Sequence, residues 1–150
     1  MRALQIALLS LLPLALHAAP PGQQPELTAA HLLGAIDVPL SAALLARFSL
    51  DRPALETFLA DGKQARYVRL RALNGLGILG TAQARDRVAQ ALRADADEAV
   101  RAEAVVVLAR AWAQRGDALA LVALQESQAK QPPVRVARTL EEELARLATP

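Results

Sequence analysis

The chain has no cysteine and few aromatic residues, which make up 3% of its 150 positions. Without cysteine it is neither a disulfide-stapled scaffold nor a protein lipidated on a cysteine. The residues on which strands mainly draw are scarce, which argues against an all-β domain. Its 7 glycines and 9 prolines exclude collagen-like and mucin-like chains. What it has instead is 34 Ala and 28 Leu, both strong helix formers, so the composition predicts a single all-α domain.

The N-terminal segment has the pattern of a secretory signal peptide. Arg2 supplies a positive charge, residues 3–16 are mainly apolar, and small alanines follow. The apolar run is too short for a transmembrane helix of about 20 residues, although an uncleaved anchor or a buried helix is the alternative. We expect residues 1–18 to be removed after Ala18 and residues 19–27 to form a flexible linker. The mature protein is therefore predicted to be periplasmic or secreted, with no stable membrane insertion.

Aligned residues indicate an internal repeat. Val-Arg pairs recur at Val68–Arg69, Val100–Arg101 and Val134–Arg135. A frame of 32 residues aligns one leucine in each unit: Leu44, Leu76, Leu108 and Leu140. Four residues earlier the same frame aligns a second apolar set: Leu40, Ala72, Ala104 and Val136. Because residues four apart lie on one face of a helix, the frame predicts stacked helices with apolar stripes.

The frame and its turn residues predict where the helices lie. The expected helices are a short one near 28–35, pairs at 40–48 with 52–60, 66–79 with 83–93 and 98–114 with 117–128, and a last helix at about 133–147. Asp97 is expected to cap the helix that follows it. Pro53 suits a first helical turn, where its missing N–H has no partner to lose. The segment Val68–Arg71 alternates as a half-buried strand would, but its Ala-rich copy at 100–108 favours a helix.

These segments resemble HEAT-like repeats of the short bacterial PBS-lyase type, in which Val-Arg stands near the start of the first helix. The resemblance covers residues 60–150, and a degenerate unit precedes it at 36–60. It implies an α-solenoid of antiparallel helix pairs, with three to four repeats in a domain spanning residues 28–150.

The resemblance also implies roles for two sets of charged residues. The arginines of the Val-Arg pairs, Arg69, Arg101 and Arg135, are expected to pair with an acidic residue of a neighbouring turn or repeat. Asp95, Asp97 and Glu98 are the nearby candidates, and a ligand site is the alternative. The run Glu141–Glu143 looks like the polar cap that a stack of repeats requires at its end.

A basic stretch between residues 63 and 93 is the main candidate for partner binding. Six of its residues form the candidate surface: Lys63, Arg66, Arg71, Arg85, Arg87 and Arg93. Such a strip can hold an acidic protein or an anionic envelope polymer, whereas the alternative is the solvated face of amphipathic helices. Residues 19–150 carry 16 basic and 15 acidic residues, and aromatic residues do not interleave the strip. Nucleic acid is therefore not an expected partner.

Two short motifs have structural explanations in this frame. Gly75–Gly80 spells G-x-G-x-x-G, which binds dinucleotides only after a strand. Here Gly75 and Gly77 are expected to let helices approach closely, and Gly80 to end a helix. Arg115–Asp117 matches an adhesion tripeptide, but Gly and Asp also suit a turn between helices.

No catalytic, cofactor or metal site is expected. His31 is the single histidine of residues 19–150, no nucleophile turn surrounds the serines, and a metal site would need several converging ligands. We therefore expect a protein–protein interaction or scaffold module with a protein partner. Three alternatives stay open: an anionic partner at the basic strip, an accessory role beside an envelope enzyme, and self-association that covers the ends of the stack.

Overall fold

The computed structural model describes residues 28–149, and all regular structure in that range is helical. The prediction of an all-α protein is therefore confirmed. The helices are α1 (Ala29–Gly34), α2 (Ala42–Arg47), α3 (Arg52–Ala60), α4 (Arg66–Leu79), α5 (Ala82–Ala94), α6 (Glu98–Ala111), the 3-10 turn η1 (Ala113–Arg115), α7 (Ala118–Ala129) and α8 (Val134–Ala148). The expected leader at 1–18 and linker at 19–27 lie outside the described residues.

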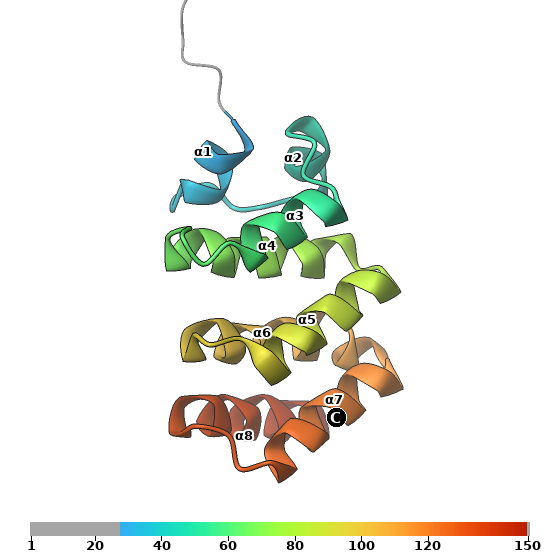
Figure 1. Ribbon diagram of the computed structural model, residues 1–150. Coiled ribbons are helices and arrows are strands. Elements are labelled where there is room, and N and C mark those ends of the chain that lie inside the picture. Colours follow the sequence, from blue (N-terminus) through green and yellow to red (C-terminus); the bar gives the residue numbers. More distant parts are fainter. Residues whose placement is uncertain (1–27, 150) are drawn as a thin grey trace, which may run out of the picture.

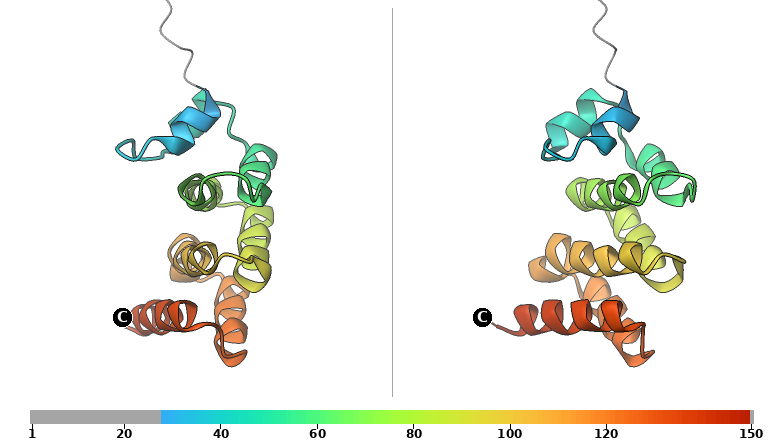
Figure 2. Two further views of the ribbon diagram at one scale, coloured as in Figure 1. Left: turned by 60° about the vertical axis from the view of Figure 1, so that its left-hand side comes forward. Right: turned by 90° about the vertical axis from the view of Figure 1, so that its left-hand side faces the viewer.

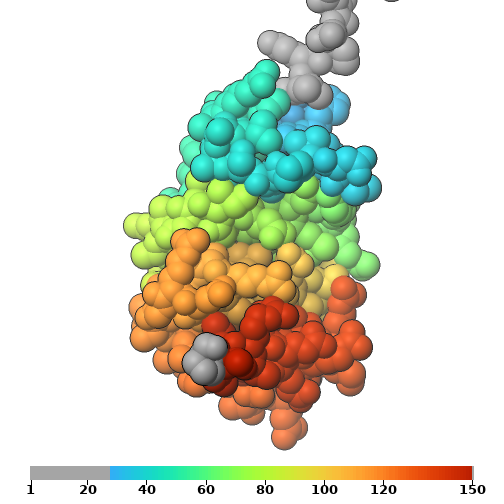
Figure 3. Space-filling view, turned by 180° about the vertical axis from the view of Figure 1, so that it is seen from behind, coloured from blue at the N-terminus to red at the C-terminus, as the bar shows by residue number. Residues whose placement is uncertain are grey.

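The helices form two layers along an elongated molecule. Helices α4, α6 and α8 stack in a first layer, and α3, α5 and α7 form a second layer beside it (Figures 1 and 2). Helices α1 and α2 lie against α4 at the N-terminal end of the stack. In the space-filling view the colours follow one another as bands from blue to red (Figure 3). Helices therefore pack mainly on the next one or two helices along the chain.

Most helices begin at a side chain that caps them. The carboxylate of Asp97 accepts a hydrogen bond from the Ala99 N–H at 2.8 Å, as expected. The other side-chain caps are Thr28, Ser41, Asp51, Thr81 and Asp117. Pro53 lies in the first turn of α3, also as expected. The strand alternative at Val68–Arg71 is wrong, because these residues lie in α4.

The columns of the 32-residue frame form the core of the first layer. Leu76, Leu108 and Leu140 are fully buried. So are the residues four positions earlier in each helix: Ala72, Ala104 and Val136. These leucines and the smaller alanines belong to one continuous buried core, and α4 and α6 approach closely where Gly77 meets Val107. The equivalents in the first unit, Leu40 and Leu44, are only partly buried, which agrees with a degenerate unit at 36–60.

The third Val-Arg pair is not equivalent to the other two. Val68 and Val100 are buried, whereas Val134 is 87% exposed. The spacing from Val100 to Val134 is 34 residues rather than 32, and two residues turn a helix by about 200°. Val134 therefore points away from the core, and the prediction that it repeats the role of Val100 is wrong.

The glycines in and after α4 have the packing roles expected of them. A Cβ on Gly75 would come within 2.8 Å of a methyl group of Leu55 in α3, and one on Gly77 within 2.8 Å of a methyl group of Val107 in α6. Gly80 ends α4 with a φ of 63°, in the left-handed region that favours glycine. The alternative that Gly75–Gly80 forms a dinucleotide-binding turn is wrong, because these glycines lie within and at the end of a helix and no strand precedes them in residues 28–149.

Candidate binding surfaces

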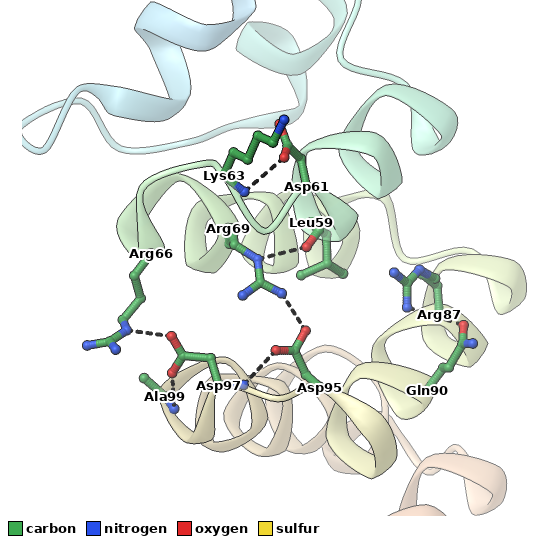
Figure 4. Close-up of polar contacts among 10 residues, drawn as sticks. All are labelled: Leu59, Asp61, Lys63, Arg66, Arg69, Arg87, Gln90, Asp95, Asp97 and Ala99. Carbon is green, nitrogen blue, oxygen red and sulfur yellow. Dashed lines mark hydrogen bonds and ion pairs between the residues drawn. The ribbon is translucent and has the colours of Figure 1, made fainter.

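The basic residues at the start of α4 pair with the loop between α5 and α6 (Figure 4). The Arg66 guanidinium donates to Asp97 at 2.6 Å. The Arg69 guanidinium donates to the Leu59 carbonyl at 2.9 Å and to Asp95 at 2.5 Å. The expected pairing of Arg69 with Asp95 is therefore confirmed. These contacts connect α3, α4 and the α5–α6 loop, so most of this positive charge is used to hold the stack together.

A similar pairing joins α5 to α7. Arg85 lies between Asp86 and Asp117, at 2.7 and 2.9 Å. Asp117 also caps α7 by accepting from the Ala120 N–H. The hydrogen bond from the Ala120 N–H, followed by the one from the Arg85 guanidinium, lowers the pKa of Asp117. Asp117 in turn raises the pKa of Arg85. The carboxylate of the Arg115–Asp117 tripeptide is thus engaged inside the protein.

Acid should destabilise the fold through these carboxylates. Arg66 lowers the pKa of Asp97, and the pKa of Asp117 is lowered as described, both from an ordinary value of 3.8. A lowered folded-state pKa gives stability that is present above 3.8 and is lost as pH falls through the folded value. We expect the free energy of unfolding, measured by urea denaturation, to hold steady from pH 7 to about 5 and to fall below about pH 4. The double variant Asp97→Asn/Asp117→Asn should show a smaller loss over the same interval than Asp37→Asn, which replaces an exposed carboxylate. An equal loss would contradict this assignment.

Arg71 does not lie on an exposed strip. It is 8% exposed, and its guanidinium donates to the carbonyls of Leu32 and Val38 at 3.3 and 2.7 Å and to the Tyr67 hydroxyl at 3.4 Å. It thus fastens α1 and the following loop onto α4. Assigning Arg71 to a partner surface was wrong, because its charge is buried among carbonyl oxygens.

The remaining candidates are divided between the α3–α4 loop and α5. Lys63 is exposed on the α3–α4 loop, where its backbone N–H donates to Asp61. Arg87 donates to Gln90 within α5, well away from Arg66 (Figure 4). Arg93 is exposed in the last turn of α5. The six predicted residues therefore do not form one continuous basic surface.

Arg69 and Arg101 occupy equivalent places, and Arg135 does not. The Arg101 guanidinium donates to the Leu92 carbonyl at 3.1 Å, matching the bond from Arg69 to Leu59. Each arginine thus binds the last turn of the preceding second-layer helix. Arg135 is exposed, and its side chain has no hydrogen bond or ion pair in residues 28–149.

Three matched substitutions test this equivalence. Arg69→Met should lower the free energy of unfolding by about 2 kcal/mol, because it removes two charge-assisted bonds and leaves Asp95 unpaired. Arg101→Met should cost about 1 kcal/mol, whereas Arg135→Met should change stability by less than about 0.5 kcal/mol. Methionine keeps the apolar part of the side chain, and urea denaturation measures all three. A cost at Arg135 equal to that at Arg69 would contradict the assignment.

An exposed groove runs between α4 and α6. Two adjoining hollows of about 350 and 440 Å³ share Asn74, Ile78 and Glu103. The α4–α6 groove, as we call the two together, extends from Tyr67 at one end to Arg115 at the other. Ile78 is 38% exposed in it, and the amide of Asn74 donates to Glu103 at 2.8 Å across it. The groove therefore combines an apolar floor with polar walls.

The groove has a net positive end. Arg110 and Arg115 line it there and are both exposed. The side chain of Arg115 makes no hydrogen bond or ion pair in the described part of the chain, whereas Arg110 is paired with Glu143 at 2.9 Å. Sequence reasoning missed this groove. The available signal was the run of three valines at 105–107, which cannot all lie on one face of α6.

A pocket of about 560 Å³ lies at the C-terminal end of the stack. Residues from α6, η1, α7 and α8 line it. On its wall the carboxylate of Glu143 accepts from Arg110 at 2.9 Å and from Arg146 at 2.6 Å. The side chain of Glu143 is only 5% exposed. The expected polar cap at Glu141–Glu143 is thus partly wrong: Glu141 and Glu142 are exposed, but Glu143 faces inward.

The described residues give no support to a metal centre or a membrane span. No group of three potential ligands among His, Asp and Glu comes together in residues 28–149. No helix in the same range is long and apolar enough to cross a bilayer. His31 lies at the start of α1, where its Nδ1 is 2.9 Å from the Thr28 hydroxyl in a reciprocal capping arrangement.

Comparisons with known proteins add no relative. No family model, no curated protein and no solved structure matches the chain.

Proposed function

We propose that this protein is an exported protein-binding module whose two layers form a HEAT-like α-solenoid of antiparallel helix pairs. The equivalent bonds of Arg69 and Arg101 support the repeat, and so do the buried leucine and alanine columns at 32-residue spacing. Stacked repeats bind partners through continuous surfaces rather than through catalytic clusters. Export rests on the leader pattern of residues 1–18 and is tested by N-terminal sequencing of the protein isolated from its own cells.

The observation that carries the binding role is the α4–α6 groove. Ile78 and Val106 provide apolar surface, and Arg115 provides positive charge at one end. An exposed apolar hollow bordered by charge is typical of a protein-interaction surface. The complementary occupant is a protein segment with apolar residues along one side and an acidic residue at one end.

The basic stretch at 63–93 is a poorer docking surface than the α4–α6 groove. Arg66 and Arg85 are paired with aspartates, Arg71 is buried, and Lys63 and Arg87 lie on different elements. In contrast, Arg115 lines the groove without a side-chain partner in residues 28–149. Charge complementarity therefore favours the groove.

Selection from a random peptide library displayed on phage tests the proposal. Immobilised protein comprising residues 19–150 should enrich amphipathic peptides that carry acidic residues. Selected peptides should bind about 10-fold more weakly to Arg115→Glu, because a favourable charge contact is replaced by a repulsive one. The matched control Arg138→Glu changes an exposed arginine of α8 outside the groove and should bind normally. Enrichment of peptides without acidic residues, or equal loss in both variants, would overturn the proposal.

A further inference from the structure

The C-terminal pocket contains two arginines held by one buried carboxylate. Arg110 uses only its Nη2 and Arg146 only its Nη1 to reach Glu143. Both arginine side chains are more than half exposed, and both line the pocket. A guanidinium has five N–H donors, so each retains donors beyond those that Glu143 occupies.

The charge of this cluster is unbalanced. One carboxylate faces two guanidiniums, which leaves one positive charge at the wall of the pocket. Glu143 is nearly buried and holds both arginine heads, so less side-chain freedom is lost when an anion binds to them. Planar guanidiniums form bidentate hydrogen bonds with carboxylates, so two exposed arginines at the wall of a pocket suit a carboxylate ligand. Glu143 is thus a positioning residue, and the arginines are the groups that would contact a ligand.

The uncharged residues that line the pocket indicate what the rest of a ligand would be. Leu121, Leu144 and Leu147 contribute apolar surface, and Gln114, Gln125 and Gln128 contribute amide groups. A volume of about 560 Å³ lies within the range of small-molecule sites. We propose that this pocket binds an organic carboxylate with a compact apolar body, the carboxylate on Arg110 and Arg146 and the body against the leucines. The source is a free small acid or the C-terminal residue of a peptide, which present the same chemistry.

This site is separate from the α4–α6 groove in its ligand and its test. Arg110 borders both, but Arg146 belongs to the pocket alone and Arg115 to the groove alone. Arg146→Gln therefore reports on the pocket, and Arg115→Gln on the groove. Failure of carboxylate binding leaves the result of peptide selection at the groove unaffected.

Titration of folded protein with N-acetyl-leucine tests the proposal, with uncharged N-acetyl-leucinamide as the matched ligand. Trp112, the single tryptophan of the chain, immediately precedes Ala113 and Gln114, which line the pocket, and its fluorescence is one readout. Backbone amide shifts of residues 109–114 and 143–149 provide a second measurement. The acid should give a saturable change, and the amide should bind about 10-fold more weakly because it lacks the charged contact. Gly-Gly-Leu with a free or an amidated C-terminus repeats the comparison for a peptide. Tighter binding of either acid form supports the proposal and identifies its source.

Two variants separate a ligand site from a purely structural ion cluster. Arg146→Gln should weaken binding of the acid about 10-fold while its far-ultraviolet circular dichroism stays unchanged. Arg138→Gln, on the same helix but outside the pocket, should bind like the parent protein. No saturable change with folded protein, equal binding of acid and amide, or parent-like binding by Arg146→Gln would overturn the proposal.

Discussion

Leu108→Ala should lower the free energy of unfolding by about 3 kcal/mol. Leu108 is fully buried in α6, the helix that contacts both α4 and α8 in the first layer and α5 and α7 in the second. Removing its branched end forfeits burial and leaves a cavity that close-packed neighbours on every side cannot fill. Urea denaturation followed by circular dichroism at 222 nm measures the loss.

The other leucines of the column provide the comparison. Leu76→Ala and Leu140→Ala should each cost within the same range of about 2–5 kcal/mol, since both are also fully buried. Leu44→Ala should cost less, because Leu44 is only partly buried at the edge of the core. A loss at Leu44 as large as that at Leu108 would mean that residues 36–60 form a complete unit rather than a degenerate one.

Gly77→Leu should also destabilise the protein by about 3 kcal/mol. Even a Cβ at this position would lie 2.8 Å from a methyl group of Val107. Because valine is β-branched, Val107 cannot move that methyl group aside without leaving its preferred rotamer. A larger side chain must push α4 and α6 apart along their shared interface. The gain in helix propensity from replacing glycine, about 0.8 kcal/mol, does not offset that separation.

Gly34→Leu is the control for this substitution. Gly34 also lies in a helix, but a Cβ there meets nothing within 4 Å. Its free energy of unfolding should stay within about 0.5 kcal/mol of the parent value. If Gly77→Leu were tolerated equally well, the close contact between α4 and α6 would be refuted.

The fold was predictable from the sequence because its signals are local and repeat. Aspartate caps, the glycine that ends α4 and the four-residue apolar spacing each act within one or two turns of helix. The same pattern at positions 32 residues apart then strengthened each of these signals. The 32-residue frame holds in α8, where Val136 and Leu140 are buried, but the third Val-Arg pair stands two positions later in that frame, so Val134 points to solvent.

The candidate sites were harder to predict because charge along a sequence does not show which charges are neutralised in space. Arg66 and Arg85 meet aspartates that lie 31 and 32 residues later, one repeat along the chain. A basic stretch in one unit is therefore largely balanced by acidic caps in the next. Arg71 was misassigned because its partners are carbonyl oxygens of α1 and the following loop, which have no residue-type signature.

The surfaces left for partners are those that this pairing does not use. In the described residues, the α4–α6 groove combines an exposed Ile78 with the unpaired side chain of Arg115. Ile78 lies in α4 and Arg115 in η1, and beside them Val106, the middle one of three consecutive valines in α6, stays partly exposed. This feature connects the repeat architecture to the proposed binding role.

Site-specific photocrosslinking in the cells that make the protein tests the binding role most directly. A benzoylphenylalanine replaces Ile78 in the groove or, in the control, the exposed Arg138 on α8. We expect a discrete adduct from position 78 that maps to an acidic, amphipathic segment of one partner and is lost when Arg115→Glu is added. No adduct from position 78 in folded protein, or the same adduct from position 138, would contradict the proposed binding role.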